Sequence, residues 1–123
     1  MFSRTAAIFG IITLCFSGVF VTPLLGAETG IASYYGAGEP LNPNTAMNIP
    51  FDPRLMECAS WDYPLGSVLQ VTSVRTGQSV VVRVTDRGPA RRLKRLLDLT
   101  REAFAIIDDL KQGLTPIRVK RLR

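Results

Sequence analysis

The class of fold is decided by one run in the chain, Val80-Val81-Val82-Arg83-Val84-Thr85-Asp86-Arg87-Gly88-Pro89. Its β-branched apolar residues are typical of a buried strand. The Asp-Arg-Gly-Pro sequence that follows is a turn signal and ends the strand. A carboxylate and a guanidinium therefore stand at a strand end, where a rigid core can direct side chains into a groove. The alternative is that Asp86 only caps a turn and pairs with Arg87.

Further segments on both sides of this run carry strand patterns. A hairpin around Thr76-Gly77 is predicted to join strands at residues 67–74 and 78–85. Either Val68 with Val71 or Leu69 with Val74 is expected to face the core. Other strands are predicted at residues 30–36, 96–99 and 115–122. Between them we predict a long irregular loop at residues 37–53 and one helical turn at residues 54–59.

Only one segment spaces its apolar residues as a helix does. Thr100 is a good N-cap, and Gly113 is a typical C-terminal stop. The sequence therefore predicts a mainly β fold with one substantial helix near the C-terminus, at residues 100–111. A closed barrel suits a small domain, because closure removes exposed sheet edges.

The N-terminal segment has the features of a secretory signal peptide. Arg4 precedes an almost wholly apolar stretch at residues 6–21, and Gly26-Ala27 offers a cleavage site. We therefore expect residues 1–27 to be removed and residues 28–123 to form one exported domain, without a stable membrane span. A retained membrane anchor is the alternative.

Composition excludes several kinds of chemistry. The chain has no histidine, and Cys58 is the single cysteine after residue 27, so neither a Cys–His nucleophile nor an internal disulfide is possible in the exported domain. We expect no metal and no cofactor, and a monomer. The net charge of +5, which becomes 14 − 10 = +4 without residues 1–27, favours an acidic partner, such as a bacterial cell wall, over nucleic acid in an exported protein. A charge that only aids solubility is the alternative. The basic residues at 91–95 could bind wall phosphates or carboxylates, or could simply be solvated.

A series of short motifs, in a fixed order, is similar to that of a known family. The motifs are Ala32-Ser33-Tyr34-Tyr35-Gly36, Thr45-Ala46, Phe51-Asp52, Pro64-Leu65-Gly66, the valine-rich strand, Asp86-Arg87-Gly88-Pro89 and Leu97-Asp98-Leu99-Thr100. Over about residues 30–121 the chain resembles the rare lipoprotein A (RlpA)-like family. The resemblance implies a six-stranded double-psi β-barrel, related in fold to expansins and barwin-like proteins.

The resemblance also implies an activity and a partner. Family members are septal lytic transglycosylases, which cleave the β-1,4 bond between N-acetylmuramic acid and N-acetylglucosamine in peptidoglycan glycan strands and leave a 1,6-anhydro sugar. One carboxyl group can serve as acid and then as base in this reaction. The implied location is the periplasm or cell envelope. Two other functions are open: a non-catalytic, expansin-like glycan-binding module, and a secreted effector or inhibitor that acts on another organism's wall.

The resemblance places the catalytic acid at Asp86, but the chain departs from the family pattern at two polar positions. Ile49 stands where the family usually has glutamate, and Ser60 stands where it usually has histidine. Glu57 and Asp62 lie close by in sequence and could compensate, or could be solvated surface. The predicted substrate-binding residues are Asp52, Ser60, Trp61, Arg87 and Tyr35.

Three aromatic residues could stack on sugar rings or could instead be core residues of the barrel: Tyr34, Tyr35 and Trp61. Asp98 is expected to fix a loop or the start of the helix.

Overall fold

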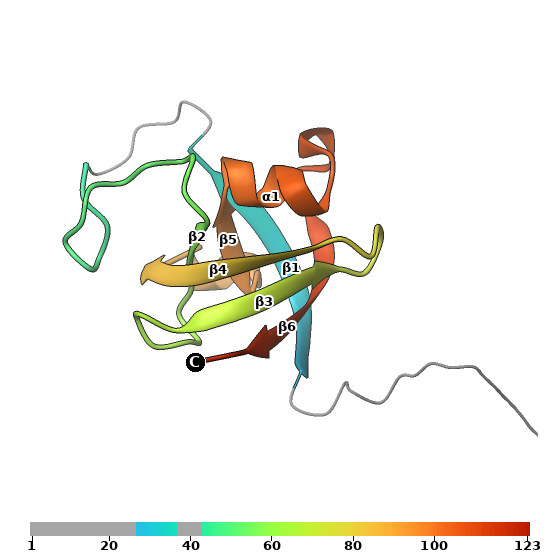
Figure 1. Ribbon diagram of the computed structural model, residues 1–123, viewed down its shortest axis with the longest axis horizontal. Helices are drawn as coiled ribbons and strands as arrows, with labels where there is room; N and C mark the ends of the chain where they lie inside the picture. Colours follow the sequence, from blue (N-terminus) through green and yellow to red (C-terminus); the bar gives the residue numbers. More distant parts are fainter. Residues whose placement is uncertain (1–26, 37–42) are drawn as a thin grey trace, which may run out of the picture.

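The structure is a computed structural model that describes residues 27–36 and 43–123 of the 123-residue chain. Six strands close into a barrel in the order β1-β5-β2-β4-β3-β6, and one short helix packs on it (Figure 1). The strands are β1 (Ala27–Tyr35), β2 (Glu57–Ala59), β3 (Val68–Ser73), β4 (Ser79–Asp86), β5 (Leu97–Thr100) and β6 (Thr115–Arg121). The helix is α1 (Arg101–Ile107). The predicted mainly β, six-stranded barrel with a single helix is confirmed.

The barrel interior is filled by alternating residues of its strands. β1 pairs in parallel with β5, β2 pairs in parallel with β4, and the other pairs are antiparallel. β3 turns Leu69 and Val71 into the core, whereas Val68 is half-buried and Val74 lies on the surface. Of the two pairs predicted to face the core, Val68 with Val71 and Leu69 with Val74, neither is right. One residue of each pair faces inward. Their register partners on β4, Val82 and Val80, are also buried.

β2 replaces the helical turn predicted at residues 54–59. Residues 54–56 form a turn, and all three residues of β2 are buried between β4 and β5. Strand formation in so short a segment depends on partners on both sides, which override local preference. Three residues are too few for alternation to be visible in the sequence.

The helix begins as predicted and ends early. The Thr100 hydroxyl accepts the amide hydrogen of Ala103 at the N-cap, but Asp108 leaves the helical conformation at φ −158° and ψ 173°. The Asp108 carboxylate is held by the guanidinium of Arg75, beyond the end of β3. Gly113 therefore ends a separate 3₁₀ turn, Leu110–Gln112, so the predicted extent of 100–111 is wrong.

Replacing Asp108 by Asn is expected to lower the melting temperature at pH 7. The hydrogen bond from Arg75 holds the pKa of the buried Asp108 carboxyl well below its usual range. A lowered pKa stabilises the fold above the unfolded pKa, about 3.9, and that stability is lost as the pH falls through the folded pKa. The difference between wild type and Asp108→Asn should therefore shrink below about pH 4.

The matched control for this pH series is Asp109→Asn. Asp109 is exposed, and its side chain accepts one hydrogen bond, from the amide of Lys111, which asparagine can also accept. Melting curves followed by circular dichroism between pH 2 and pH 8 measure both variants. An Asp108→Asn difference that persists unchanged at the lowest pH would contradict the assignment.

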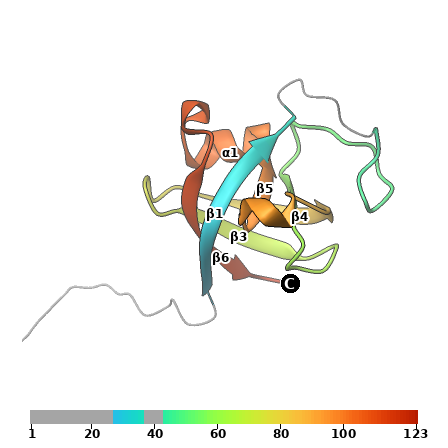
Figure 2. The same cartoon turned by 180° about the vertical axis from the view of Figure 1, so that it is seen from behind.

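The predicted signal peptide lies outside the described residues, except that Ala27 is the first residue of β1. Within residues 27–36 and 43–123, no helix has the length and apolar character needed to cross a membrane. Seen from behind, β1 runs across the front of the barrel, and the short 3₁₀ turn of Arg91–Leu93 lies beside it (Figure 2).

Candidate functional site

Asp86 ends β4, and its two carboxylate oxygens have different surroundings. Oδ1 accepts the backbone amide hydrogens of Ala46 and Arg87, at 3.0 and 2.9 Å. Oδ2 has no hydrogen-bond partner among the described residues. One oxygen therefore fixes the side chain, while the other is available to a ligand.

The loop that contacts Asp86 is folded back on itself. Met47 donates its amide hydrogen to the carbonyl of Thr85, and Thr45 donates to the carbonyl of Ile49. Asn48 takes the left-handed conformation, with φ 60°, that this tight turn requires. The predicted irregular loop and the end of the valine-rich strand are thus brought together in the structure.

Two buried hydroxyl groups lie in this region without a hydrogen-bond partner in the described part of the chain, those of Tyr35 and Thr45. The Tyr35 ring stacks on Phe51, with centroids 5.0 Å apart. Burial, and then the negative charge of Asp86, raise the pKa of the Tyr35 hydroxyl, so the phenol lies within electrostatic reach of that carboxylate. An unsatisfied buried hydroxyl is costly. The fold around Asp86 therefore leaves two polar groups unsatisfied by the described residues, although both are covered from solvent.

A second carboxyl group lies on the neighbouring strand. Glu57 of β2 is buried and accepts a hydrogen bond of 3.3 Å from the hydroxyl of Thr85, the residue before Asp86. Burial raises the pKa of Glu57. From the sequence, Glu57 could either compensate for the missing polar groups or be solvated surface, and its burial excludes the second. The Thr45 hydroxyl was not predicted as a site group, although the Thr45-Ala46 motif contains it.

Asp52 follows Phe51 on the same loop but faces an arginine. Arg54 binds both of its carboxylate oxygens, Nε to Oδ1 at 3.0 Å and Nη2 to Oδ2 at 2.9 Å. These hydrogen bonds lower the pKa of Asp52 to about 2. Among the described residues no hydrogen bond joins Asp52 to Asp86. Asp52 is therefore charged and already paired.

Ser60 and Arg87 lie directly against Asp86, but their polar groups are engaged within the fold. The amide of Ser60 donates to the Asp86 carbonyl at 3.0 Å, and its hydroxyl, fully buried, accepts from the amide of Asp62. Arg87 Nη1 donates to the carbonyls of Ser60 and Tyr63, at 2.8 and 2.7 Å. Both residues support the segment beside the Asp86 carboxylate.

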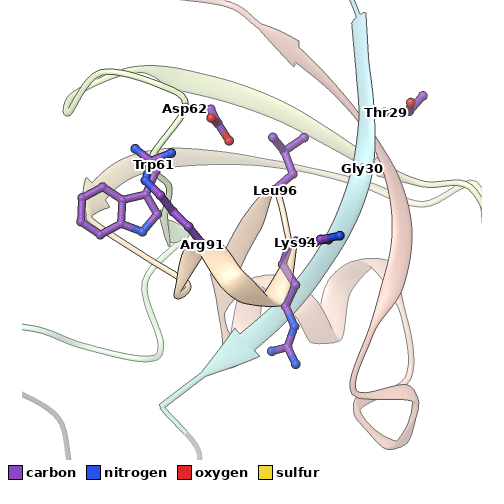
Figure 3. Close-up of a pocket in the computed structure, with 8 residues that line it drawn as sticks. Thr29, Gly30, Trp61, Asp62, Arg91, Lys94 and Leu96 are labelled. Carbon is purple, nitrogen blue, oxygen red and sulfur yellow. The ribbon is translucent and has the colours of Figure 1, made fainter.

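Trp61 lies on a neighbouring surface, 44% exposed. Its indole Nε1 donates to the carbonyl of Pro89 at 2.8 Å, and the guanidinium of Arg91 lies 5.1 Å from the ring centroid. The ring borders a pocket of about 280 Å³ whose lining does not include Asp86 (Figure 3). The predicted site residues thus fall into two adjoining regions.

Asp98 lies on β5, which runs parallel to β1, and the hydroxyl of Ser33 on β1 donates to its Oδ1 at 2.9 Å. This hydrogen bond joins β1 to β5, the strand that leads directly into α1. The role expected for Asp98, fixing a loop or the start of the helix, stays a prediction.

A closed six-stranded barrel with two parallel pairs defines the class of protein as a double-psi β-barrel of the expansin type. The chain belongs to the lytic transglycolase family, whose profile matches residues 27–119. This confirms the resemblance found in the motifs.

Solved structures and curated relatives support this assignment. An expansin from Clavibacter michiganensis superimposes with a TM-score of 0.61 and 27% identity, covering 79% of this chain and 50% of that one. The Streptomyces papain inhibitor, at 24% identity and a TM-score of 0.61, shares the fold, covering 79% of this chain and 94% of that one.

The similar curated proteins are considerably longer. A Nostoc protein named probable endolytic peptidoglycan transglycosylase RlpA is 39% identical over 92 residues, which are 74% of this chain and 24% of that protein. The endolytic peptidoglycan transglycosylase RlpA of Rickettsia typhi is 33% identical over 103 residues, 82% of this chain and 32% of the relative. The chain therefore spans between a quarter and a third of their length.

Proposed function

We propose that this domain is an exported peptidoglycan lytic transglycosylase of the periplasm or cell envelope, with Asp86 as its acid and base. The observation that carries the proposal is the asymmetry of the Asp86 carboxylate, with Oδ1 fixed by two amides and Oδ2 without a partner in the described part. A fixed carboxyl group with one free oxygen can deliver a proton in a defined direction. The names of the relatives supply the substrate class.

The reaction needs one proton to travel in a closed cycle. The protonated Asp86 gives its proton to the glycosidic oxygen as the bond from that oxygen to C1 of N-acetylmuramic acid breaks. The 6-hydroxyl oxygen of the same sugar bonds to C1, and its proton returns to the Asp86 carboxylate. No water is consumed, so a second carboxylate to activate water is unnecessary. The absence of the family's glutamate, with Ile49 in its place, is compatible with this single-carboxyl scheme.

Tyr35 and Thr45 would bind the substrate in this scheme. Their buried hydroxyls have no partner in the described part of the fold and lie in the same region as Asp86. In this scheme substrate binding exposes them, and each then forms a hydrogen bond to a sugar without losing one to the protein. Glu57 is the alternative candidate for the acid. Burial raises its pKa, and a hydrogen bond from Thr85, the residue before Asp86, holds its carboxylate near the end of β4.

Tyr35→Phe is expected to leave the melting temperature unchanged or slightly raised and to lower the rate of glycan cleavage by about tenfold. Phenylalanine keeps the stack on Phe51 and removes only a hydroxyl that the fold leaves unsatisfied. Thermal melts and product assays on the same preparation measure the two effects. A fall in stability without a fall in rate would assign the hydroxyl a purely structural role.

The proposed activity is tested by incubating the domain with purified peptidoglycan sacculi and analysing the soluble products by mass spectrometry. Products ending in 1,6-anhydro-N-acetylmuramic acid, lighter by one water than the hydrolysed form, are expected. Reducing ends alone would contradict the proposal and indicate hydrolysis.

The second candidate is a glycan-binding module that does not cleave. Ser60 favours this candidate, because it stands at the position where the family pattern has histidine, cannot titrate and is fully buried. Co-sedimentation of the domain with sacculi, without soluble products, would support this module. A secreted effector would instead act only on sacculi of another species.

A further inference from the structure

The pocket beside Trp61 gathers cationic side chains from a single turn. Arg91, Lys94 and Arg95 line it together with Thr29, Gly30, Asp62 and Leu96 (Figure 3). The 3₁₀ turn Arg91–Leu93 ends at Lys94, whose amide donates to the Arg91 carbonyl at 3.0 Å. Lys94 closes the turn in the left-handed conformation, with φ 56°, and its side chain lines the pocket together with that of Arg91. Arg92, between them, is exposed and does not line the pocket.

These cations are not neutralised within the described part of the protein. Its ion pairs join Arg54 to Asp52, Arg75 to Asp108 and Arg101 to Glu102, and none includes a residue of the pocket. Asp62 is the one carboxylate in the lining. Three cations against one carboxylate leave the pocket positively charged, so it favours an anionic group over a neutral one.

The pocket also offers a fixed aromatic surface. The hydrogen bond to Pro89 holds the indole of Trp61, and nearly half of the side chain stays exposed. Gly30 allows β1 to approach Leu96, because a Cβ at that position would lie 2.7 Å from the Leu96 Cβ. The apolar floor and the Trp61 ring suit the flat face of a sugar ring.

We propose that this pocket binds an acidic sugar unit of a polysaccharide. The sugar ring contacts Trp61, and its carboxylate or phosphate lies among Arg91, Lys94 and Arg95. The pocket is distinct from the Asp86 carboxylate but connected to it, since the amide of Ser60, next to Trp61, donates to the Asp86 carbonyl. The inference concerns binding alone and does not depend on cleavage at Asp86.

The fluorescence of Trp61, the only tryptophan of the chain, reports on occupancy directly. The probes are a hyaluronan hexasaccharide, which carries carboxylates, and chitohexaose, a neutral chain of the same number of sugars. We expect hyaluronan to bind about tenfold more tightly at low salt, and the advantage to fall as salt screens the charges. A third probe, a phosphorylated mannopentaose, carries its phosphate on a sugar ring and so distinguishes phosphate from carboxylate: whichever acidic probe binds more tightly identifies the acid group.

The matched variants are Arg91→Gln and Lys94→Gln against Arg92→Gln on the same turn. The first two are expected to weaken hyaluronan binding by about three- to tenfold each, and Arg92→Gln by less than about twofold. Equal losses in all three variants would overturn the proposal and indicate a diffuse charge effect. The proposal would also be overturned if neutral chitohexaose bound as tightly as both acidic probes. Selective binding by a domain that leaves sacculi intact would contradict the proposed cleavage and support this pocket.

Discussion

Replacing Asp86 by Asn is expected to lower the rate of anhydro-sugar release by about 10²–10⁴-fold while the fold is kept. The asparagine Oδ1 can still accept the amide hydrogens of Ala46 and Arg87, so the loop stays attached to β4. The amide nitrogen then takes the place of Oδ2, and it can neither deliver the proton to the leaving oxygen nor remove one from the 6-hydroxyl. Time courses of product release from sacculi measure the loss.

Two comparisons make this result specific. Asp109→Asn is the same chemical change on the exposed surface and should leave the rate unchanged. Co-sedimentation should show that Asp86→Asn still binds sacculi, which separates a lost proton from lost affinity. If cleavage survives in Asp86→Asn, the acid lies elsewhere, and Asp86→Asn combined with Glu57→Gln identifies whether it is Glu57.

Replacing Phe104 by Ala is expected to destabilise the domain by about 3–5 kcal/mol. Phe104 is fully buried between α1 and the barrel, and its ring packs against that of Tyr34 with centroids 4.8 Å apart. Small domains have about 5 kcal/mol or little more in total, so a substantial fraction of this variant should be unfolded at 37 °C. Urea denaturation followed by far-ultraviolet circular dichroism measures the change.

The control for this prediction lies two residues further along the same helix. Ile106 is 48% exposed, so Ile106→Ala removes an apolar side chain of similar helix context without opening a cavity. We expect a change within about 0.5 kcal/mol. Alanine is the better helix former at both positions, so helix propensity cannot cause a loss. Similar losses in both variants would therefore contradict the assignment of the effect to the burial of Phe104 against the barrel.

The elements that could be predicted from the sequence are those whose patterns are local and long. The valine-rich strand, its partner at residues 68–73 and the Thr100 cap each follow from a periodicity or a terminal signal. β2 and the end of α1 could not be predicted, because each depends on partners far away in the chain. β2 is a strand because β4 and β5 flank it, and α1 ends where Arg75 binds Asp108.

The candidate site was predictable only in part, for a similar reason. The motifs pointed to Asp86 and to Thr45-Ala46, but whether each polar side chain is free, paired or buried depends on the tertiary structure. Asp52 is paired with Arg54, and Ser60 is buried, although both stand at expected positions. The pocket beside Trp61 combines residues 29–30, 61–62 and 91–96, and no local pattern relates these three segments.

The contact between Asp86 and Ala46 has a consequence for how the sequence can change. The loop orients the carboxylate through a backbone amide, which every residue except proline possesses. The exposed side chain at position 46 can therefore change while the direction of the acid is preserved. The orientation of Asp86 is thus independent of the side chain at position 46, where only proline would remove the donor.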